Sequence, residues 1–301
     1  MKTFFVTGAT GFIGQRLVKE LDGEIRVLSR KKQPNFDTVV CDLENELVPS
    51  NALNNIDTVF HLAGFELDSD DLTGIKDQYQ KVNADAPVRL AELAAVSGVK
   101  KFIFVSSVKA GGLPFFGQCA SEDDFREPDG IYGKTKRKAE LALLEISKNS
   151  DMQISIIRPS LVYGPNVQGN FKSMMLSIKK GWFPPLPETG NKKSMIHVDD
   201  LVQAILYLTK VKQVDGEIFI ATDGKSYSSR EIYNIMHLLV GRDPPKWSIP
   251  LLLFNTVGLI SPRIKYKINK LLGDECYSSS KLEALGFKPK RSLKDLNENS
   301  F

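Results

Sequence analysis

The chain has 301 residues, of which 42% are hydrophobic and 25% charged, and its formal net charge is +4. This length and apolar content suffice for a large buried core, in one large domain or two coupled domains. The small net charge and the dispersed lysines argue against nucleic acid as a partner. The opening hydrophobic run is short and leads into a glycine loop, so we expect no signal peptide and a cytoplasmic location.

The amino terminus predicts a dinucleotide-binding turn. Residues 2–7 (KTFFVT) form a strand-like run, residues 15–21 have a helical pattern, and Gly8, Gly11 and Gly14 stand between them. Glycines at a strand-to-helix turn let the backbone approach a pyrophosphate, which then lies at the helix amino terminus. The spacing is G-x-x-G-x-x-G rather than G-x-G-x-x-G, and an ordinary tight turn is the alternative interpretation.

The residues after the second predicted strand, 25–28, bear on the choice of cofactor. An acidic residue at this point would bind the ribose 2′-hydroxyl of NAD. The chain instead has Ser29, Arg30, Lys31 and Lys32, and these cations suit a 2′-phosphate. NADP(H) is therefore the preferred cofactor and NAD(H) the alternative. A solvated basic loop without a binding role would give the same pattern.

Strand-like runs recur at 38–40, 57–61, 101–105 and 154–158. Helix-like stretches separate several of them, so the chain is predicted to have an α/β fold, a Rossmann-type doubly wound parallel sheet. Pro87 interrupts the helical pattern of residues 81–96, and we expect a boundary or kink there.

Two hydroxyl groups and an amine suggest proton transfer. Ser107 follows strand 101–105, where a side chain at the carboxyl end of a parallel strand faces the cofactor crevice. Tyr132 and Lys136 are four residues apart, on one face of a helix that we expect over 134–148. The ammonium is expected to lower the pKa of the phenol, which could then exchange a proton with a carbinol oxygen. Taken alone, the pair also fits a half-buried tyrosine beside a surface lysine, and Ser107 could simply begin a loop.

After residue 164 the strand pattern weakens, and a second domain is predicted. The expected dinucleotide-binding domain is 1–164, rejoined by 195–222, and the smaller, discontinuous substrate domain is 165–194 with 223–301. The return to the first domain is inferred from a predicted helix at 199–208 and a predicted strand at 217–221. Segment 111–130 has no periodicity and is predicted to be a long loop that covers the substrate.

The most apolar stretch is 249–260 (IPLLLFNTVGLI). It is too short for a transmembrane helix, and it contains Pro250, Asn255 and Gly258. A core or subunit-contact helix is favoured over attachment to a membrane surface.

The cysteines and histidines do not predict a disulfide bond or a metal site. Cys41, Cys119 and Cys276 are far apart and odd in number, which argues against a disulfide framework and against a zinc site. The three histidines show no ligand spacing, so no metal is expected.

Taken together, these motifs resemble the extended short-chain dehydrogenase/reductase family, in its epimerase and dehydratase branch. The motifs in order are Thr7–Gly14, Asp42-Leu43, His61–Gly64, Val82-Asn83, Ser106-Ser107, Tyr132 with Lys136, Arg158–Pro165 and His197–Leu201. The resemblance implies that Ser107, Tyr132 and Lys136 are the catalytic residues. The cofactor-binding residues that it implies, with Arg30 added from the charge argument, are Gly8, Gly11, Phe12, Ile13, Gly14, Arg30, Asp42, Leu43, Leu62, Ala63, Gly64, Asn83, Tyr132, Lys136 and Pro159.

A narrower resemblance concerns UDP-N-acetyl-hexosamine 4-epimerases and 4-keto-6-deoxy-sugar reductases. It is carried by residues 98–109, 169–171, 270–273 and 285–289. It implies substrate contacts at Ser107, Lys109, Asn170, Phe171 and Lys193, where Lys193 stands in the place of a diphosphate-binding arginine. The sugar 4,6-dehydratases of the family carry Asp-Glu directly after the catalytic Ser or Thr. Val108 and Lys109 occupy those positions here, which argues against dehydration.

The leading hypothesis is an NADP(H)-preferring reductase of a nucleotide-linked 4-keto-6-deoxy sugar, because a reductase must exchange its cofactor at every turnover. The alternatives are a UDP-hexose or UDP-N-acetylhexosamine 4-epimerase and a non-catalytic nucleotide-binding scaffold. The resemblance also implies a homodimer through a helix pair.

Overall fold

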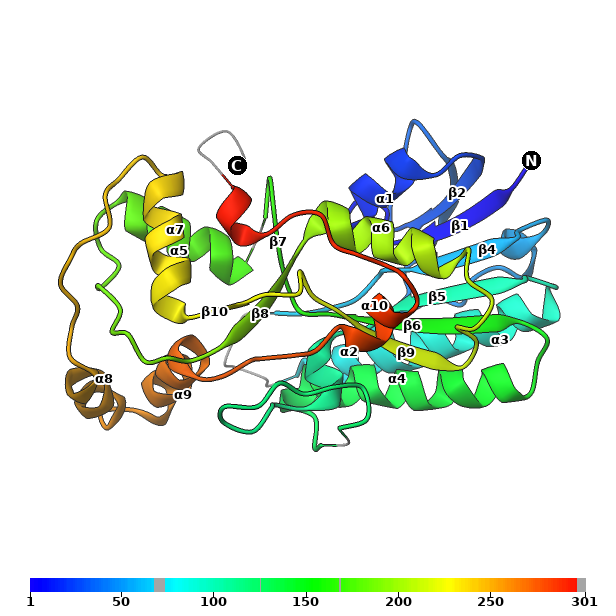
Figure 1. Ribbon diagram of the computed structural model, residues 1–301. Helices are drawn as coiled ribbons and strands as arrows, with labels where there is room; N and C mark the ends of the chain where they lie inside the picture. The colour runs from blue at the N-terminus through cyan, green and yellow to red at the C-terminus, as the bar shows by residue number, and fades with distance from the viewer. Residues whose placement is uncertain (68–73, 125, 168, 297–301) are drawn as a thin grey trace.

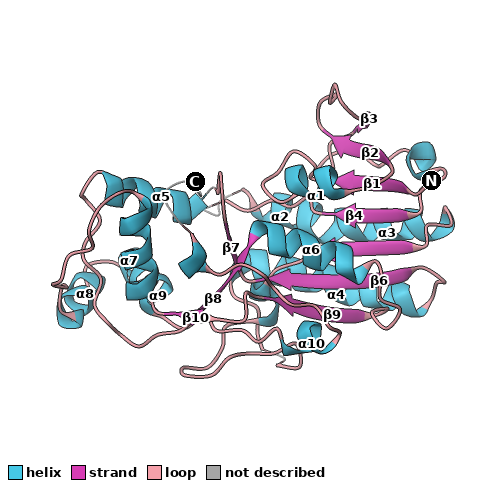
Figure 2. Ribbon diagram, turned by 45° about the horizontal axis from the view of Figure 1, so that its top comes forward, coloured by secondary structure: helices cyan, strands magenta, loops and turns pink. Residues whose placement is uncertain are grey.

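The computed structural model describes residues 1–67, 74–124, 126–167 and 169–296. Its centre is a parallel sheet with the strand order β3-β2-β1-β4-β5-β6-β9 (Figure 2). The strands are β1 (Thr3–Thr7), β2 (Glu24–Ser29), β3 (Asp37–Val40), β4 (Thr58–His61), β5 (Lys101–Val105), β6 (Gln153–Pro159) and β9 (Glu217–Ala221). The order reverses between β1 and β4, and a crevice for a ligand forms at the carboxyl ends of strands at such a point. The predicted doubly wound sheet is confirmed.

Helices cover both faces of this sheet (Figure 1). They are α1 (Gly14–Glu20) and α6 (Val198–Leu208) on one face, and α3 (Ala86–Val96) and α4 (Gly130–Lys148) on the other. Leu17 and Leu201 pack with the first face, whereas Leu90 and Leu143 pack with the second. Strands that are buried on both faces are apolar along their whole length, as the run KFIFV of β5 is.

The helical segment before α3 changes its winding ahead of Pro87. Helix α2 (Lys76–Gln80) continues into a π-helical segment, η2 (Lys81–Asp85), and then into α3. Proline has no N–H to donate to the carbonyl four residues earlier, and its ring crowds that carbonyl. The wider π-helical turn makes room for the proline ring at this point. The expected irregularity is therefore present, although the helix continues through it.

The rest of the chain forms a smaller unit beside the carboxyl ends of the strands. Its elements are a three-stranded sheet, β7 (Leu161–Tyr163), β8 (Lys193–His197) and β10 (Ser226–Tyr227), with α5 (Gly169–Lys179), α7 (Ser229–Leu239), α8 (Leu251–Gly258) and α9 (Pro262–Leu272). Helix α10 (Ser280–Ala284) packs instead against β9 of the large sheet. Short 3-10 turns are η1 (Ser50–Leu53), η3 (Val108–Gly111) and η4 (Leu293–Asp295). Strand β8 belongs to the small sheet, so the chain returns to the large sheet with α6. Leu282 and Phe287, expected in the substrate domain, pack into the core of the large sheet.

The long loop before α4 lies along a late segment of the chain. The Ala120 amide donates to the Cys276 carbonyl (2.9 Å), and the Gly117 amide donates to the Asp274 carboxylate (2.6 Å). Cys119 and Cys276 form a disulfide, with their Cα atoms 4.4 Å apart. The prediction of no disulfide was wrong, because the two cysteines meet only through this tertiary contact, across 157 residues of sequence.

The apolar stretch 249–260 forms α8 and the turn that follows it. Phe254 is buried, but most of the apolar side chains of this stretch are exposed. The expectation of a core helix was therefore wrong, and the subunit-contact alternative stays a prediction. Among the residues that the structure describes, none of the helices combines the length and apolarity needed to cross a membrane.

Candidate active site

The glycine turn after β1 is closely packed against the loop after β4. Gly8 has φ +72°, and a Cβ there would lie 2.7 Å from the Ala63 amide nitrogen. A Cβ on Gly14 would lie 2.1 Å from the Gly8 carbonyl oxygen, so α1 can begin here only with glycine. Gly11 donates to the same carbonyl (3.0 Å) and is exposed. The turn thus presents bare backbone at the crevice, which is the feature that a pyrophosphate requires.

Two neighbours in this turn face the smaller unit. Ile13 packs on the core that α1 shares with α6, whereas Phe12 packs on the core of the smaller unit. The Arg16 guanidinium lies 4.8 Å from the Phe12 ring centre and 3.2 Å from the Asp199 carboxylate. The turn is therefore tied to both units.

The loops after β2 and β3 hold the next two predicted contacts. Arg30 directly follows β2 and is exposed. The Asp42 carboxylate accepts hydrogen bonds from the Glu44 amide (3.2 Å) and the Asn45 side chain (2.9 Å). It is therefore bound within the turn that Asp42 begins. Leu43 is buried in the core below. At this edge Arg30 is thus exposed to solvent, together with Lys31 and Lys32.

The loop after β4 is fixed from two sides. The Leu62 and Ala63 amides donate to the carbonyl and hydroxyl oxygens of Thr7 (both 3.2 Å). Asn83 is buried, and its side-chain amide exchanges two hydrogen bonds of 2.7 Å with the Phe65 backbone. Asn83 therefore holds the loop in place, and the cofactor contact that the resemblance implies would be indirect.

The predicted catalytic groups lie at the start of α4 and the end of β5. A Cβ on Gly133 would lie 2.4 Å from the Lys109 carbonyl oxygen, so the segment after β5 packs directly against the helix turn that carries Tyr132. Ser107 begins that segment, and its hydroxyl accepts from the Lys109 amide (3.3 Å). The structure thus brings Ser107, Tyr132 and Lys136 to one region.

Lys136 points into the protein under the loop after β4. It is buried, and its ammonium donates to the Val105 carbonyl (3.1 Å). The ammonium lies 4.7 Å from the Phe104 ring centre, and a Cβ on Gly64 would lie 3.3 Å from it. Burial lowers the pKa of Lys136 to about 8. Lys136, on the same helix as Tyr132, therefore reaches the loop after β4, which packs on the glycine turn.

The prediction that the pKa of Tyr132 is lowered was wrong for the protein without cofactor. Burial raises the pKa of Tyr132, and the negative charge of Glu66 raises it further. The Lys136 ammonium is 6.0 Å from the Tyr132 ring centre, too far to reverse these effects. Tyr132 is therefore a protonated phenol that is ready to donate.

A second cation lies on the other side of the phenol. The Lys109 ammonium is 5.2 Å from the Tyr132 ring centre and pairs with Glu66 (2.5 Å). Burial acts to lower the pKa of Lys109, but the Glu66 charge outweighs this effect and the pKa is raised. The Tyr79 ring packs edge-on against Tyr132, with 6.4 Å between centres. Sequence reasoning missed Glu66 and Tyr79, because neither stands in a recognisable motif.

Beneath the catalytic helix lies a buried ion pair that the sequence analysis also missed. Both Arg158 and Glu140 are fully buried, and the guanidinium makes two hydrogen bonds to the carboxylate (2.8 and 2.6 Å). The Ser106 hydroxyl donates to the same carboxylate (2.6 Å). Glu140 is four residues after Lys136, and that spacing could have predicted a shared helix face. The cluster ties α4 to β5 and β6 where the catalytic groups lie.

Three of the predicted substrate residues, Asn170, Phe171 and Lys193, lie in the smaller unit. Lys193 on β8 donates to the Lys270 carbonyl (2.9 Å) and pairs with Glu275 (3.3 Å). Phe171 is buried in the core of this unit. Pro159, which was predicted as a cofactor contact, is buried at the end of β6 in the large sheet. The side chain of Asn170 lies outside the described residues. The other two predicted substrate residues follow β5: the Lys109 ammonium lies against the Tyr132 ring, and the Ser107 hydroxyl accepts from the Lys109 amide.

Comparisons with known proteins fit this geometry. A sequence profile of the NAD dependent epimerase/dehydratase family matches residues 4–221. A UDP-glucose 4-epimerase of Vibrio cholerae is 31% identical over 98% of this chain and 93% of its own length.

The chain belongs to the NAD dependent epimerase/dehydratase family. The expected membership in the extended short-chain dehydrogenases/reductases is confirmed. An Escherichia coli O157:H7 family member is 25% identical over 93% of this chain and 88% of its own length; it is named N-acetyl-alpha-D-glucosaminyl-diphospho-ditrans,octacis-undecaprenol 4-epimerase. In fold, the chain is similar to MoeE5 in complex with UDP-glucuronic acid and NAD (TM-score 0.77, 23% identity, 97% and 95% of the two chains). It is equally similar to a UDP-glucose 4-epimerase of Thermotoga maritima with UDP-glucose (TM-score 0.77, 22% identity, 97% and 95%).

The residues present fit a nicotinamide dinucleotide. Gly8 and Gly14 leave no room for side chains, Gly11 exposes its backbone, and Lys136 borders the same crevice. A bound cofactor would rest on the glycine turn, with Lys136 and Tyr132 beside its reactive end.

Proposed function

We propose that this chain is a 4-epimerase of sugars that are linked through a diphosphate to a carrier. The observation that carries the proposal is the position of Tyr132, with the buried Lys136 ammonium 6.0 Å and the Lys109 ammonium 5.2 Å from its ring centre, while Lys136 also lies beside Gly64 in the loop packed on the glycine turn. The name and near-complete overlap of the Vibrio cholerae relative favour the epimerase over the reductase.

In this reaction the residues of the chain move a proton and hold the sugar. A bound NAD(P) would accept the hydride and return it and, when oxidised, would add a positive charge to the site. The oxidation step requires Tyr132 as the phenolate, so its phenol must first lose its proton to solvent. The phenolate would then take the proton of the 4-hydroxyl group as the carbon is oxidised, and it would return that proton when the ketone is reduced on its other face. Ser107 donates a hydrogen bond to the same oxygen, and Lys136 stabilises the phenolate. Substrate and product have the same oxidation state, so no external reductant is consumed.

The carrier can be either a nucleoside or a lipid, because both present the same diphosphate to the protein. The two relatives named above have these two carriers, a uridine in one and a polyprenol in the other. The site has no acidic pair for elimination, since Val108 and Lys109 follow Ser107. The 4-epimerase therefore fits better than a dehydratase.

A reductase of a 4-keto-6-deoxy sugar is the second candidate, and the basic loop after β2 favours it. Arg30, Lys31 and Lys32 are exposed and suit the 2′-phosphate of NADP(H), which a reductase would draw from solution. Arg30→Ala should weaken the binding of NADP(H) roughly tenfold and leave the binding of NAD(H) unchanged. Lys148→Ala, an exposed lysine at the far end of α4, is the control. Equal losses for both cofactors would contradict phosphate recognition.

Stoichiometry separates the two candidates. The protein is incubated with UDP-glucose or UDP-N-acetylglucosamine without added cofactor, and the sugars are resolved by proton NMR. Interconversion of the 4-epimers without net redox supports the epimerase. Consumption of one NADPH per 4-keto-6-deoxy sugar, with no interconversion of the UDP-sugars, would contradict the epimerase and support the reductase. Turnover of neither substrate class, soluble or lipid-linked, would overturn both.

A further inference from the structure

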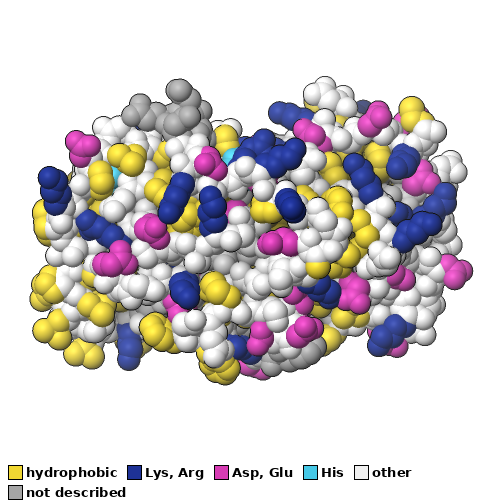
Figure 3. All heavy atoms as spheres, viewed as in Figure 1, with side chains coloured by type: hydrophobic (Ala, Val, Ile, Leu, Met, Phe, Trp, Pro, Cys, Tyr) yellow, Lys and Arg dark blue, Asp and Glu magenta, His cyan; other side chains and the backbone are white. Residues whose placement is uncertain are grey.

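Helix α8 and the turn after it expose a group of large apolar side chains. Leu252, Leu259 and Ile260 are 72%, 80% and 75% exposed, and Leu251, Leu253 and Val257 are exposed too. Phe254 anchors the helix in the core of the smaller unit, so the outward side chains are not needed to hold it. Apolar side chains gather over this corner of the molecule, at the lower left of Figure 3. A patch of this kind marks a contact with another surface.

Cations flank this patch. Residues 244–273 contain Lys246, Arg263, Lys265, Lys267 and Lys270 and neither Asp nor Glu. Helix α9 packs on α8, since a Cβ on Gly258 would lie 3.7 Å from Ile268 and from Lys265, and both Lys265 and Lys267 are exposed. A second copy of this chain would bring the same cations face to face. Anionic headgroups, by contrast, would meet the lysines while the leucines enter the acyl boundary.

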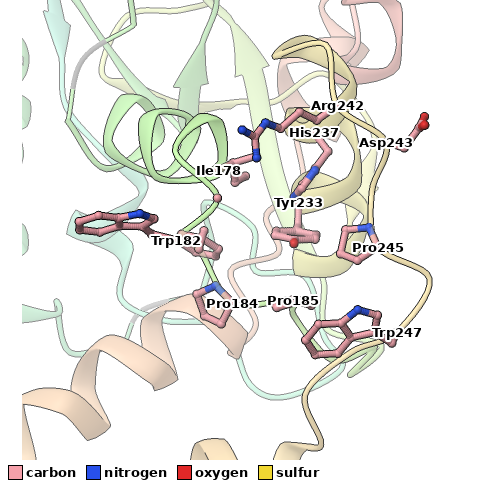
Figure 4. Close-up of a pocket in the computed structure, with 12 residues that line it drawn as sticks. Ile178, Trp182, Pro184, Pro185, Tyr233, His237, Arg242, Asp243, Pro245 and Trp247 are labelled. Carbon is pink, nitrogen blue, oxygen red and sulfur yellow. The ribbon is translucent and has the colours of Figure 1, made fainter.

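Two tryptophans extend the patch. Trp182 and Trp247, which are 83% and 63% exposed, lie on two sides of an open hollow of about 620 Å³, with Arg242 also in its lining (Figure 4). The Ile249 amide donates to the Pro185 carbonyl (3.0 Å), so the segment that leads into α8 lies beside the segment that carries Trp182. Tryptophan is the side chain that favours the boundary between water and lipid.

The patch is connected to the substrate side of the protein. Lys193, at the family position for a diphosphate contact, donates to the Lys270 carbonyl near the end of α9. Asp274, two residues after α9, accepts from the Gly117 amide of the long loop before α4 and from the Lys192 amide (2.7 Å). A carrier that leaves the diphosphate site could thus follow α9 to the apolar patch.

We propose that α8 and the turn to Ile260 dock this protein on an anionic phospholipid bilayer, from which it takes a sugar that is linked by a diphosphate to a lipid. The choice of substrate rests on the proposed 4-epimerase function, whereas the docking surface does not. The test is sedimentation of the full chain with vesicles of phosphatidylcholine, with and without phosphatidylglycerol, at low and high salt.

The wild type is expected to sediment with the anionic vesicles and to be released by salt. Leu252→Ser with Leu259→Ser should bind the same vesicles at least about tenfold more weakly, because two apolar side chains are lost from the contact. The matched control is Leu47→Ser with Val96→Ser, which removes side chains of similar exposure (74% and 84%) elsewhere on the surface. The α8 variant should keep wild-type turnover of a UDP-sugar and lose turnover of the lipid-linked sugar in vesicles.

Each other outcome has a definite meaning. Docking is overturned if the wild type stays in solution with every vesicle, or if the α8 variant binds as the wild type does. A change from dimer to monomer in light scattering, without vesicle binding, would make α8 a subunit contact instead. Vesicle binding by a protein that turns over no sugar would support the docking surface and reject the proposed function.

Discussion

The candidate active site and the α8–α9 surface place their side chains in opposite ways. At the candidate site and beneath it, charged groups are withdrawn from water: Lys136, Glu140 and Arg158 are all buried. On α8, leucines that could form a core face outward instead. Each arrangement costs free energy that ordinary folding would avoid. Such departures therefore point to function: proton transfer in the first region and contact with a partner surface in the second.

The largest effect is expected in the crevice. Tyr132→Phe removes the hydroxyl that donates and accepts the proton, and it should lower turnover by roughly a hundredfold to ten-thousandfold. Epimer formation is measured by NMR, and cofactor binding is measured separately by fluorescence. The control is Tyr207→Phe on α6, whose hydroxyl donates to the Leu285 carbonyl (2.6 Å) away from the crevice. Turnover in Tyr132→Phe near that of the control would remove the catalytic assignment.

The buried ion pair beneath α4 should give the next largest effect, this time on stability. Glu140→Gln leaves the Arg158 charge buried without its carboxylate, and the free energy of unfolding should fall by roughly 3 to 5 kcal/mol. Glu145→Gln, on the exposed side of the same helix, is the control, since its partners are Lys148 and Asn149 at the surface. Urea denaturation measures both variants. Equal stability in the two would show that the pair does not hold α4.

The buried ammonium of Lys136 should make stability depend on pH. Its pKa in the folded protein is about 8, below the ordinary value of 10.5. Between these values the unfolded chain keeps a proton that the folded chain has released, so the free energy of unfolding should rise with pH by about 3 kcal/mol. Lys136→Met, which cannot titrate, should lack this rise. Parallel pH curves for wild type and variant would mean that the ammonium is not destabilised by burial.

The sequence predicted the large sheet well because parallel strands buried on both faces leave a strong local pattern. The run KFIFV became β5, and the predicted strand 217–221 became β9 at the sheet edge. The disulfide could not be predicted, since Cys119 and Cys276 meet only after the long loop lies along the late segment. The exposure of α8 was also hidden, because a run of leucines has the same pattern whether it faces a core or a membrane.

The candidate site could be predicted in part for the same reason. Glycines, Ser107, Tyr132 and Lys136 belong to motifs with fixed spacing, whereas Glu66 and Glu140 act through tertiary contacts. The pKa of Tyr132 shows the limit most clearly. Helix spacing placed a cation one turn away, but it gave no measure of burial or of the Glu66 charge, and these two effects decide the direction of the shift.

The smallest effect is expected on α8, and it would separate folding from docking. In vesicle-free buffer, Leu252→Ser with Leu259→Ser should change the free energy of unfolding by no more than about 0.5 kcal/mol, because both side chains are already in water. Phe254→Ala in the same helix should cost about 3 kcal/mol or more, since it removes the buried anchor. A large loss of stability in the leucine variant would mean that these side chains support the fold of the chain, and the contrast between buried charges at the candidate site and a free apolar surface on α8 would then fail.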